Sequence, residues 1–120
     1  MKPIFLTTVL LSFVISQEAF AKEFKCEFQS KFHCDGNSCI PIEPTTWNLV
    51  DLETKSIARC DNQGCDWYEM EIHQSGFFTI FDVAERGFMA KMSIDGKSYI
   101  EIATLGTEAY VSQGSCELRR

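Results

Sequence analysis

The chain has 120 residues, of which 45% are hydrophobic and 23% are charged, a balance typical of one ordinary globular domain. This composition excludes a disordered tail, a collagen-like rod and a low-complexity linker. Eleven Lys and Arg residues against 17 Asp and Glu residues give a formal net charge of −6. Because neutralising phosphates supplies most of the affinity for nucleic acids, we expect no nucleic-acid partner.

The N-terminal segment has the pattern of a secretory signal peptide. Lys2 is followed by an apolar run over residues 4–15 and then by the small-x-small sequence Ala19-Phe20-Ala21. The run is shorter than the roughly 18 unbroken apolar residues that a bilayer span needs, and polar residues interrupt it. The sequence therefore predicts a signal peptide over residues 1–21, a single domain over residues 22–120, no membrane span, and a periplasmic or secreted protein.

The first predicted strand of the domain alternates between apolar and polar residues, so that each kind lies on its own face. One face holds Phe24, Cys26, Phe28 and Phe32, and the other holds Lys25, Glu27, Gln29, Lys31 and His33. The following segment, residues 40–44, is expected to be irregular, because each of its two prolines lacks the N–H group that a strand ladder needs.

Short alternating segments separated by turn residues continue to the C-terminus, and no helix of any length is predicted. The predicted strands are Trp47–Leu52, Ser56–Cys60, Asp66–Ile72, Phe77–Ala84, Phe88–Ile94, Ser98–Leu105 and Glu108–Gln113. Ser75-Gly76 and Asp95-Gly96 read as turns between neighbouring strands. The pattern predicts an all-β fold, an antiparallel meander of about eight strands that forms a small closed or nearly closed barrel. A two-layer sandwich is the alternative.

The six cysteines follow a repeated spacing. Cys34 to Cys39 and Cys60 to Cys65 each enclose four turn residues, and such a hairpin loop sets its flanking residues opposite each other. Cys26 lies in the first strand and Cys116 follows the last strand, and these two strands are neighbours in a closed meander. In an oxidising compartment we therefore expect the disulfides Cys26–Cys116, Cys34–Cys39 and Cys60–Cys65. The alternative is a zinc ion bound by the four thiolates of the two C-x4-C loops.

Other polar residues are better explained without catalysis or a cofactor. Oxygen-bearing side chains in the two cysteine loops could ligate calcium, but the same residue types form turns; they are Asp35, Asn37, Asp61, Asn62 and Asp66. His33 and His73 are the only histidines, and no nucleophile motif accompanies either of them. We therefore predict no metal, no cofactor and no enzymatic activity.

The strand carboxylates are expected to form a solvated acidic face that could steer a basic protein partner. They are Glu69, Glu71, Asp82, Glu85 and Glu101. Phe77 and Phe78 are adjacent, and since neighbours in a strand face opposite ways, both faces of their strand should be apolar. One of the two rings is then covered by a loop or exposed as a contact surface for a partner or a second copy.

Several motifs together resemble a group of small exported bacterial proteins of unknown function. They are Trp47 and Asp51, the segment Arg59-Cys60-Asp61-x-x-Gly64-Cys65-Asp66-x-Tyr68, Ser75-Gly76, Ala103-Thr104-Leu105-Gly106 and Gly114-x-Cys116. This resemblance covers most of the domain and implies no activity.

The sequence is more distantly similar to periplasmic inhibitors of c-type lysozyme, small eight-stranded barrels with a cysteine near each end. Cys26 and Cys116 match that layout. These inhibitors place a Ser-Gly-x-x-Tyr loop in the lysozyme cleft; here the segment begins with Ser75-Gly76 but has Thr79 in place of the tyrosine. Their Trp-x-Lys-Gly segment has no counterpart in this chain.

These observations predict an exported, non-enzymatic binding module, resembling a lysozyme inhibitor, that recognises a protein or envelope partner. Ser75, Gly76, Phe77 and Phe78 are the candidate binding residues. The alternative prediction is a carrier that holds a small apolar ligand inside the barrel. The sequence does not indicate an oligomeric state.

Overall fold

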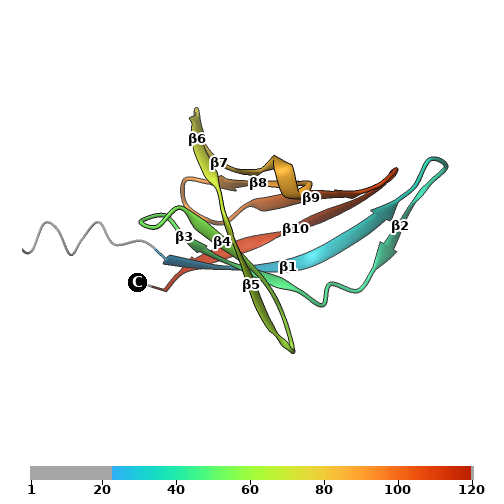
Figure 1. The fold of residues 1–120 in the computed structure, drawn as a ribbon, viewed down its shortest axis with the longest axis horizontal. Coiled ribbons are helices and arrows are strands. Elements are labelled where there is room, and N and C mark those ends of the chain that lie inside the picture. The colour runs from blue at the N-terminus through green and yellow to red at the C-terminus, as the bar shows by residue number, and fades with distance from the viewer. Residues whose placement is uncertain (1–22, 120) are drawn as a thin grey trace, which may run out of the picture.

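Residues 23–119 are described by a computed structural model, in which they form one antiparallel sheet (Figure 1). Its strands are β1 (Glu23–Cys34), β2 (Cys39–Ile42), β3 (Trp47–Asp51), β4 (Ser56–Asp61), β5 (Gly64–Glu69), β6 (Glu71–Ser75), β7 (Phe78–Val83), β8 (Phe88–Ser93), β9 (Tyr99–Leu105) and β10 (Glu108–Leu118). A short 3-10 helix, η1 (Ala84–Arg86), joins β7 to β8. The predicted signal peptide lies outside the described residues.

The sheet curves until it is nearly closed, which confirms the predicted all-β barrel. Its strand order is β5-β4-β3-β1-β10-β9-β8-β7-β6, and β2 pairs with β1 beside β3. The two edge strands, β5 and β6, follow each other in the chain, with Met70 alone between them. Figure 1 shows this stretch as one long diagonal across the sheet. The Met70 N–H donates to the carbonyl oxygen of Lys55 at 3.0 Å, and the Met70 side chain is buried in the core, so the junction is anchored to the turn between β3 and β4 and to the core.

Two details raise the strand count of the described chain above the predicted eight. Residues 39–42 form β2 despite Pro41, because among residues 23–119 β2 pairs with β1 alone and its other side needs no ladder donor. The predicted strand over residues 66–72 is divided at Met70, since β5 pairs with β4 whereas β6 pairs with β7.

A β-bulge in β1 reverses the predicted alternation of its second half. Phe28 lies opposite Gly114, but Ser30 lies opposite Gln113, so Gln29 is an extra residue in this strand. Beyond the bulge Lys31 and His33 face the barrel interior, and Phe32 lies on the outer face with 36% of its surface exposed. The prediction that Phe32 shares a face with Phe28, and that His33 is an exposed residue of a polar face, is therefore wrong.

The three disulfides pair as the spacing predicts. Cys26 lies opposite Cys116 in the β1–β10 ladder and the two are bonded, although they are 90 positions apart in the chain. Cys34–Cys39 and Cys60–Cys65 each close a hairpin. All six thiols are used in this way, so the four thiolates of the alternative zinc site are not present.

The core lies between the two halves of the curved sheet. Its largest fully buried side chains include Phe81, Ile57 and Val50, which are surrounded by further residues from β1, β3, β7, β8 and β9. No helix within residues 23–119 combines the length and the apolar character needed to cross a membrane. The packed interior leaves the turns and the outer face as the surfaces at which a partner can be bound.

Candidate binding surface at two hairpin tips

The β6–β7 hairpin ends in an exposed aromatic turn. Ser75 and Phe78 are paired, so the turn consists of Gly76 and Phe77, and Gly76 has a φ of 62°, a left-handed value that glycine adopts without strain. Phe77 is therefore a turn residue and not a strand residue as predicted, and 77% of its surface is exposed. Phe78 begins β7 and is 40% exposed. The structure thus brings the four predicted binding residues together at one tip.

A second tip adjoins this turn and adds another apolar side chain. The loop from Ile94 to Ser98 connects β8 to β9, and the N–H of Ile94 donates to the carbonyl oxygen of Phe77 at 2.9 Å. Ile94 is 78% exposed. We call Gly76, Phe77, Phe78 and Ile94 the tip surface. Sequence reasoning did not find Ile94, because the Asp95-Gly96 motif predicts a tight turn with Ile94 inside the preceding strand.

The second loop is held firmly against the barrel. The N–H of Cys116 donates to the carbonyl oxygen of Gly96 at 2.7 Å, which attaches the loop to β10 beside the disulfide with Cys26. Within the loop the Asp95 carboxylate accepts hydrogen bonds from the Lys97 N–H at 3.0 Å and from the Ser93 hydroxyl at 2.7 Å. These two donors, the Lys97 N–H first, lower the pKa of Asp95. The loop is therefore ordered by its own hydrogen bonds and by both of its neighbours.

A shallow groove of about 400 Å³ runs from the tip surface along the barrel. Phe78 and Lys91 form its end near the tip, and the Lys91 ammonium lies 5.4 Å from the centre of the Phe78 ring. Gln29, the extra residue of the bulge, and Gln113 contribute amide groups to the same groove. The surface beside the exposed rings therefore offers polar groups that can hydrogen-bond to a partner.

Thr79, which occupies the tyrosine position of the inhibitor loop, points away from this surface. It is buried, and its hydroxyl lies 3.1 Å from the Gln74 amide nitrogen, within hydrogen-bond distance. Because Thr79 alternates with Phe78 in β7, the outward position belongs to Phe78. Any contact made by this hairpin therefore comes from Phe77 and Phe78.

A network of polar side chains crosses the barrel interior, and the sequence did not predict this network. Glu101 was expected on a solvated face, but it is 2% exposed. Its carboxylate accepts hydrogen bonds from the Asn48 amide at 2.9 Å and from the Arg59 guanidinium at 3.1 Å. The Asn48 amide also donates to the Tyr99 hydroxyl at 2.7 Å. Burial, and next the charge of Glu101, raise the pKa of the Tyr99 phenol.

More charged groups from β1 line the same end of the interior. Nε2 of His33 lies 2.7 Å from the Glu108 carboxylate, and the His33 ring stacks on Tyr110 with the ring centres 4.7 Å apart. Burial lowers the pKa of Lys31, and the charge of Arg59 lowers it further. This histidine is therefore held by its contact with the Glu108 carboxylate and by an aromatic ring.

Asp35 and Asp61 form turns, as the sequence predicts for the cysteine loops, whereas Asp66 lies within β5 opposite Arg59. The Asp35 carboxylate accepts hydrogen bonds from the N–H groups of Asn37 at 2.8 Å and Ser38 at 2.9 Å, which lower its pKa. The Asp61 carboxylate likewise accepts from the N–H of Gln63 at 2.8 Å. These contacts explain the Cys-Asp-x-x-x-Cys pattern shared by the two loops as local turn chemistry.

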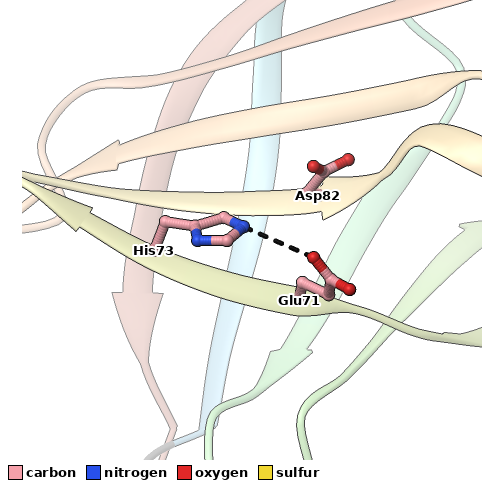
Figure 2. A group of neighbouring side chains, drawn as sticks. All are labelled: Glu71, His73 and Asp82. Atoms are coloured by element: carbon pink, nitrogen blue, oxygen red, sulfur yellow. Dashed lines mark ion pairs between the residues drawn. The ribbon is translucent and has the colours of Figure 1, made fainter.

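The remaining strand carboxylates gather at the base of the β6–β7 hairpin. Glu69, Glu71, Asp82 and Glu85 line one hollow of about 420 Å³ near the β5–β6 junction. Figure 2 shows Glu71 and Asp82 beside His73, on neighbouring strands. The predicted acidic face is thus concentrated here, without Glu101.

Comparison of the chain with protein-family models, with curated proteins and with solved structures finds no match.

Proposed function

We propose that the protein is an exported, non-enzymatic binding module that recognises a basic protein through the tip surface. The observation that carries this proposal is the pair of large apolar side chains, Phe77 and Ile94, each more than three-quarters exposed and joined by a backbone hydrogen bond. Apolar side chains on a backbone that hydrogen bonds already hold bind well, because little backbone conformational entropy is lost when a partner covers them. Aromatic residues are also prominent among the residues that dominate binding energy.

Charge supports a basic partner. The chain carries a formal net charge of −6, and four carboxylates line the hollow at the base of the same hairpin that ends in Phe77. At a rise of about 3.3 Å per residue, the five residues of β6 separate that hollow from the tip by roughly 17 Å. One interface of ordinary size, about 800 Å² on each partner, can cover both. A cationic protein would thus meet apolar contacts and opposite charge on one side of the barrel.

The most concrete partner is a c-type lysozyme. The resemblance to lysozyme inhibitors implies a barrel with its ends joined by cysteines and a Ser-Gly turn that contacts the enzyme. The Cys26–Cys116 bond and the exposed turn after Ser75 support this form of the proposal. In this chain Phe77 would occupy the lysozyme cleft, since Thr79 is buried.

Export to an oxidising compartment, either the periplasm or the outside of the cell, belongs to the same proposal. The three disulfides support it, because such bonds persist mainly where thiols are not kept reduced. The alternative function, a carrier with an apolar ligand inside the barrel, has less support. The interior is occupied by Phe81, Ile57 and Val50 and is crossed by the hydrogen-bonded Glu101 carboxylate.

The experiment uses the oxidised protein, residues 22–120, and a purified c-type lysozyme. Calorimetric titration measures the affinity, and lysis of a cell-wall suspension measures inhibition. We expect the wild type to bind and to slow lysis. Phe77→Ser and Ile94→Ser should each weaken binding by about tenfold or more, the loss typical of a dominant contact.

Ile40→Ser and Ile42→Ser are the matched controls. These residues are 53% and 36% exposed on β2, which pairs with β1 and lies apart from the β6–β7 hairpin in Figure 1, and their replacement should leave the affinity unchanged. A wild-type protein that neither binds nor inhibits the lysozyme would remove this form of the proposal. Loss of binding in the controls alone would place recognition on another face.

A further inference from the structure

Three metal-binding side chains meet on the outer side of the β6–β7 hairpin. Glu71 and His73 lie two residues apart in β6, so they point to the same face, and Asp82 lies opposite Glu71 in β7. Figure 2 shows the His73 ring and the Glu71 carboxylate directed toward each other, with Asp82 on the adjoining strand. The sequence prediction of no metal did not consider this combination, which exists only when the two strands are paired.

The distances suit a small divalent ion. Nε2 of His73 lies 3.6 Å from Oε2 of Glu71, and one ligand atom from each of the three residues lies within 4.8 Å of the others. In a tetrahedral zinc site with bonds of about 2.0–2.1 Å, two ligand atoms are separated by roughly 3.4 Å. The His73–Glu71 pair is already close to that separation, and Asp82 needs only a small side-chain movement to complete three corners.

We propose that Glu71, His73 and Asp82 bind one zinc ion, with a fourth coordination position open to solvent. An imidazole nitrogen with two carboxylate oxygens is a donor set that suits zinc, whereas calcium prefers six to eight oxygen ligands. Three protein ligands with one open position are the arrangement of zinc sites that bind a further molecule.

The surroundings favour a cation at this point. The carboxylates of Glu69 and Glu85 line the same hollow as Glu71 and Asp82, so the local charge is strongly negative. Oδ1 of Asp82 accepts the N–H of Ala84 at 2.9 Å, which fixes this carboxylate and leaves its other oxygen available. The Glu71 and His73 side chains are 79% and 54% exposed, so a hydrated ion reaches them without opening the barrel.

A bound ion would join β6 to β7. In the described part of the chain β6 is an edge strand that pairs with β7 alone, and the hairpin that these strands form carries the tip surface. An ion with ligands from both strands would therefore slow local opening of the hairpin. This consequence gives a readout that is independent of any partner protein.

The test is a calorimetric titration of the oxidised, metal-free protein with zinc sulfate, with separate titrations of calcium and magnesium. We expect one zinc ion per chain and no measurable heat from the other two ions. His73→Ala should abolish binding, and Asp82→Asn and Glu71→Gln should each weaken it by about tenfold or more. Glu85→Gln is the matched control, because it removes one charge from the same hollow without removing a ligand, and it should retain binding within about threefold.

NMR spectra distinguish the two histidines. Zinc should shift the imidazole signals of His73 and leave those of His33, which is paired with Glu108 on another part of the barrel. Amide exchange in β6 should slow when zinc is added. Zinc binding that survives His73→Ala, zinc-dependent shifts at His33 instead, or equal binding of calcium would each overturn the proposal.

Discussion

The bond between Cys26 and Cys116 is expected to contribute more to stability than either of the other disulfides. It joins residues 90 positions apart, whereas each hairpin disulfide joins residues only 5 positions apart. Loop-closure entropy in the unfolded chain then gives about 4–5 kcal/mol for the long link and about 2 kcal/mol for each short one. Since a domain of this kind is stable by about 5–15 kcal/mol, loss of the long link alone removes a large part of the free energy of unfolding.

Three double variants separate the effect of loop length on stability from the effect of cysteine burial. Cys26→Ala with Cys116→Ala opens the long link; pairs of alanines at 34 and 39 and at 60 and 65 open the short ones. Cys60 is buried like Cys26, whereas both ends of the 34–39 link are at least partly exposed, so comparing the two short-link variants measures the cost of the buried cavity. Guanidinium unfolding at pH 7, followed by circular dichroism, gives the three free energies.

We expect the 26–116 variant to lose about 2–3 kcal/mol more than the 60–65 variant. The m-value should also rise most in the 26–116 variant, because its unfolded chain becomes the most expanded. If the 26–116 and 60–65 variants lose equal free energy, the reasoning from loop closure is refuted for this barrel.

Three further predictions concern the interior and the bulge. Arg59→Met should cost about 2–3 kcal/mol in urea unfolding, less than for a fully buried pair because the Arg59 side chain is 34% exposed, and adding Glu101→Leu should recover most of the loss. Because the pKa of Tyr99 is raised in the folded state, its protonated phenol contributes fully to stability below the unfolded pKa of 10.0, and this contribution falls as the pH rises above that value. Tyr99→Phe should therefore remove this fall, which is measured as the decrease of the unfolding midpoint at alkaline pH. Gly114→Ala should lower the thermal midpoint strongly, since its Cβ would overlap the Glu27 carbonyl oxygen, whereas Gly36→Ala, with open space around it, should leave the midpoint unchanged.

The fold could be predicted from the sequence because its signals are local. Alternation marks the strands, glycine marks the turns, and the two C-x4-C loops place each cysteine pair across a hairpin. The link from Cys26 to Cys116 follows from closure of the meander, since closure makes the first and last strands neighbours. Each of these steps needs only spacing along the chain and the geometry of antiparallel pairs.

The bulge at Gln29 has no signal of its own in β1. Its cause lies in the partner strand, where Gly114 allows the β1 backbone to approach more closely than any side chain would permit. The reversal after the bulge turns Lys31 and His33 inward, so a periodicity read through residues 24–33 assigns the second half of the strand to the wrong face.

Burial of Glu101 depends on contacts between strands that are distant in the sequence. The segment Tyr99-Ile100-Glu101-Ile102-Ala103 favours an inward face formed by the two isoleucines, but the opposite face is inside. The inward position of Glu101 is stabilised by its hydrogen bonds with Asn48 in β3 and Arg59 in β4. The sequence of β9 alone therefore does not predict these hydrogen-bond partners.

The grouping of Glu71, His73 and Asp82 depends on the position of the turn between β6 and β7, which the sequence predicts one residue too early. A turn at Ser75-Gly76 would pair Gln74 with Phe77 and would leave Glu71 opposite Ile80. The observed turn is one residue further along the chain, and counting back from it pairs Glu71 with Asp82. A shift of one residue in a hairpin turn therefore decides whether a carboxylate stands beside its neighbours.

The central claim, recognition of a basic protein through the tip surface, is tested most directly by hydrogen–deuterium exchange on the oxidised protein with and without a c-type lysozyme. We predict added protection in the Ser75–Phe78 turn and in the loop around Ile94, with the β1–β2 hairpin unchanged. Exchange that is identical with and without the lysozyme, or protection confined to the β1–β2 hairpin, would contradict the claim.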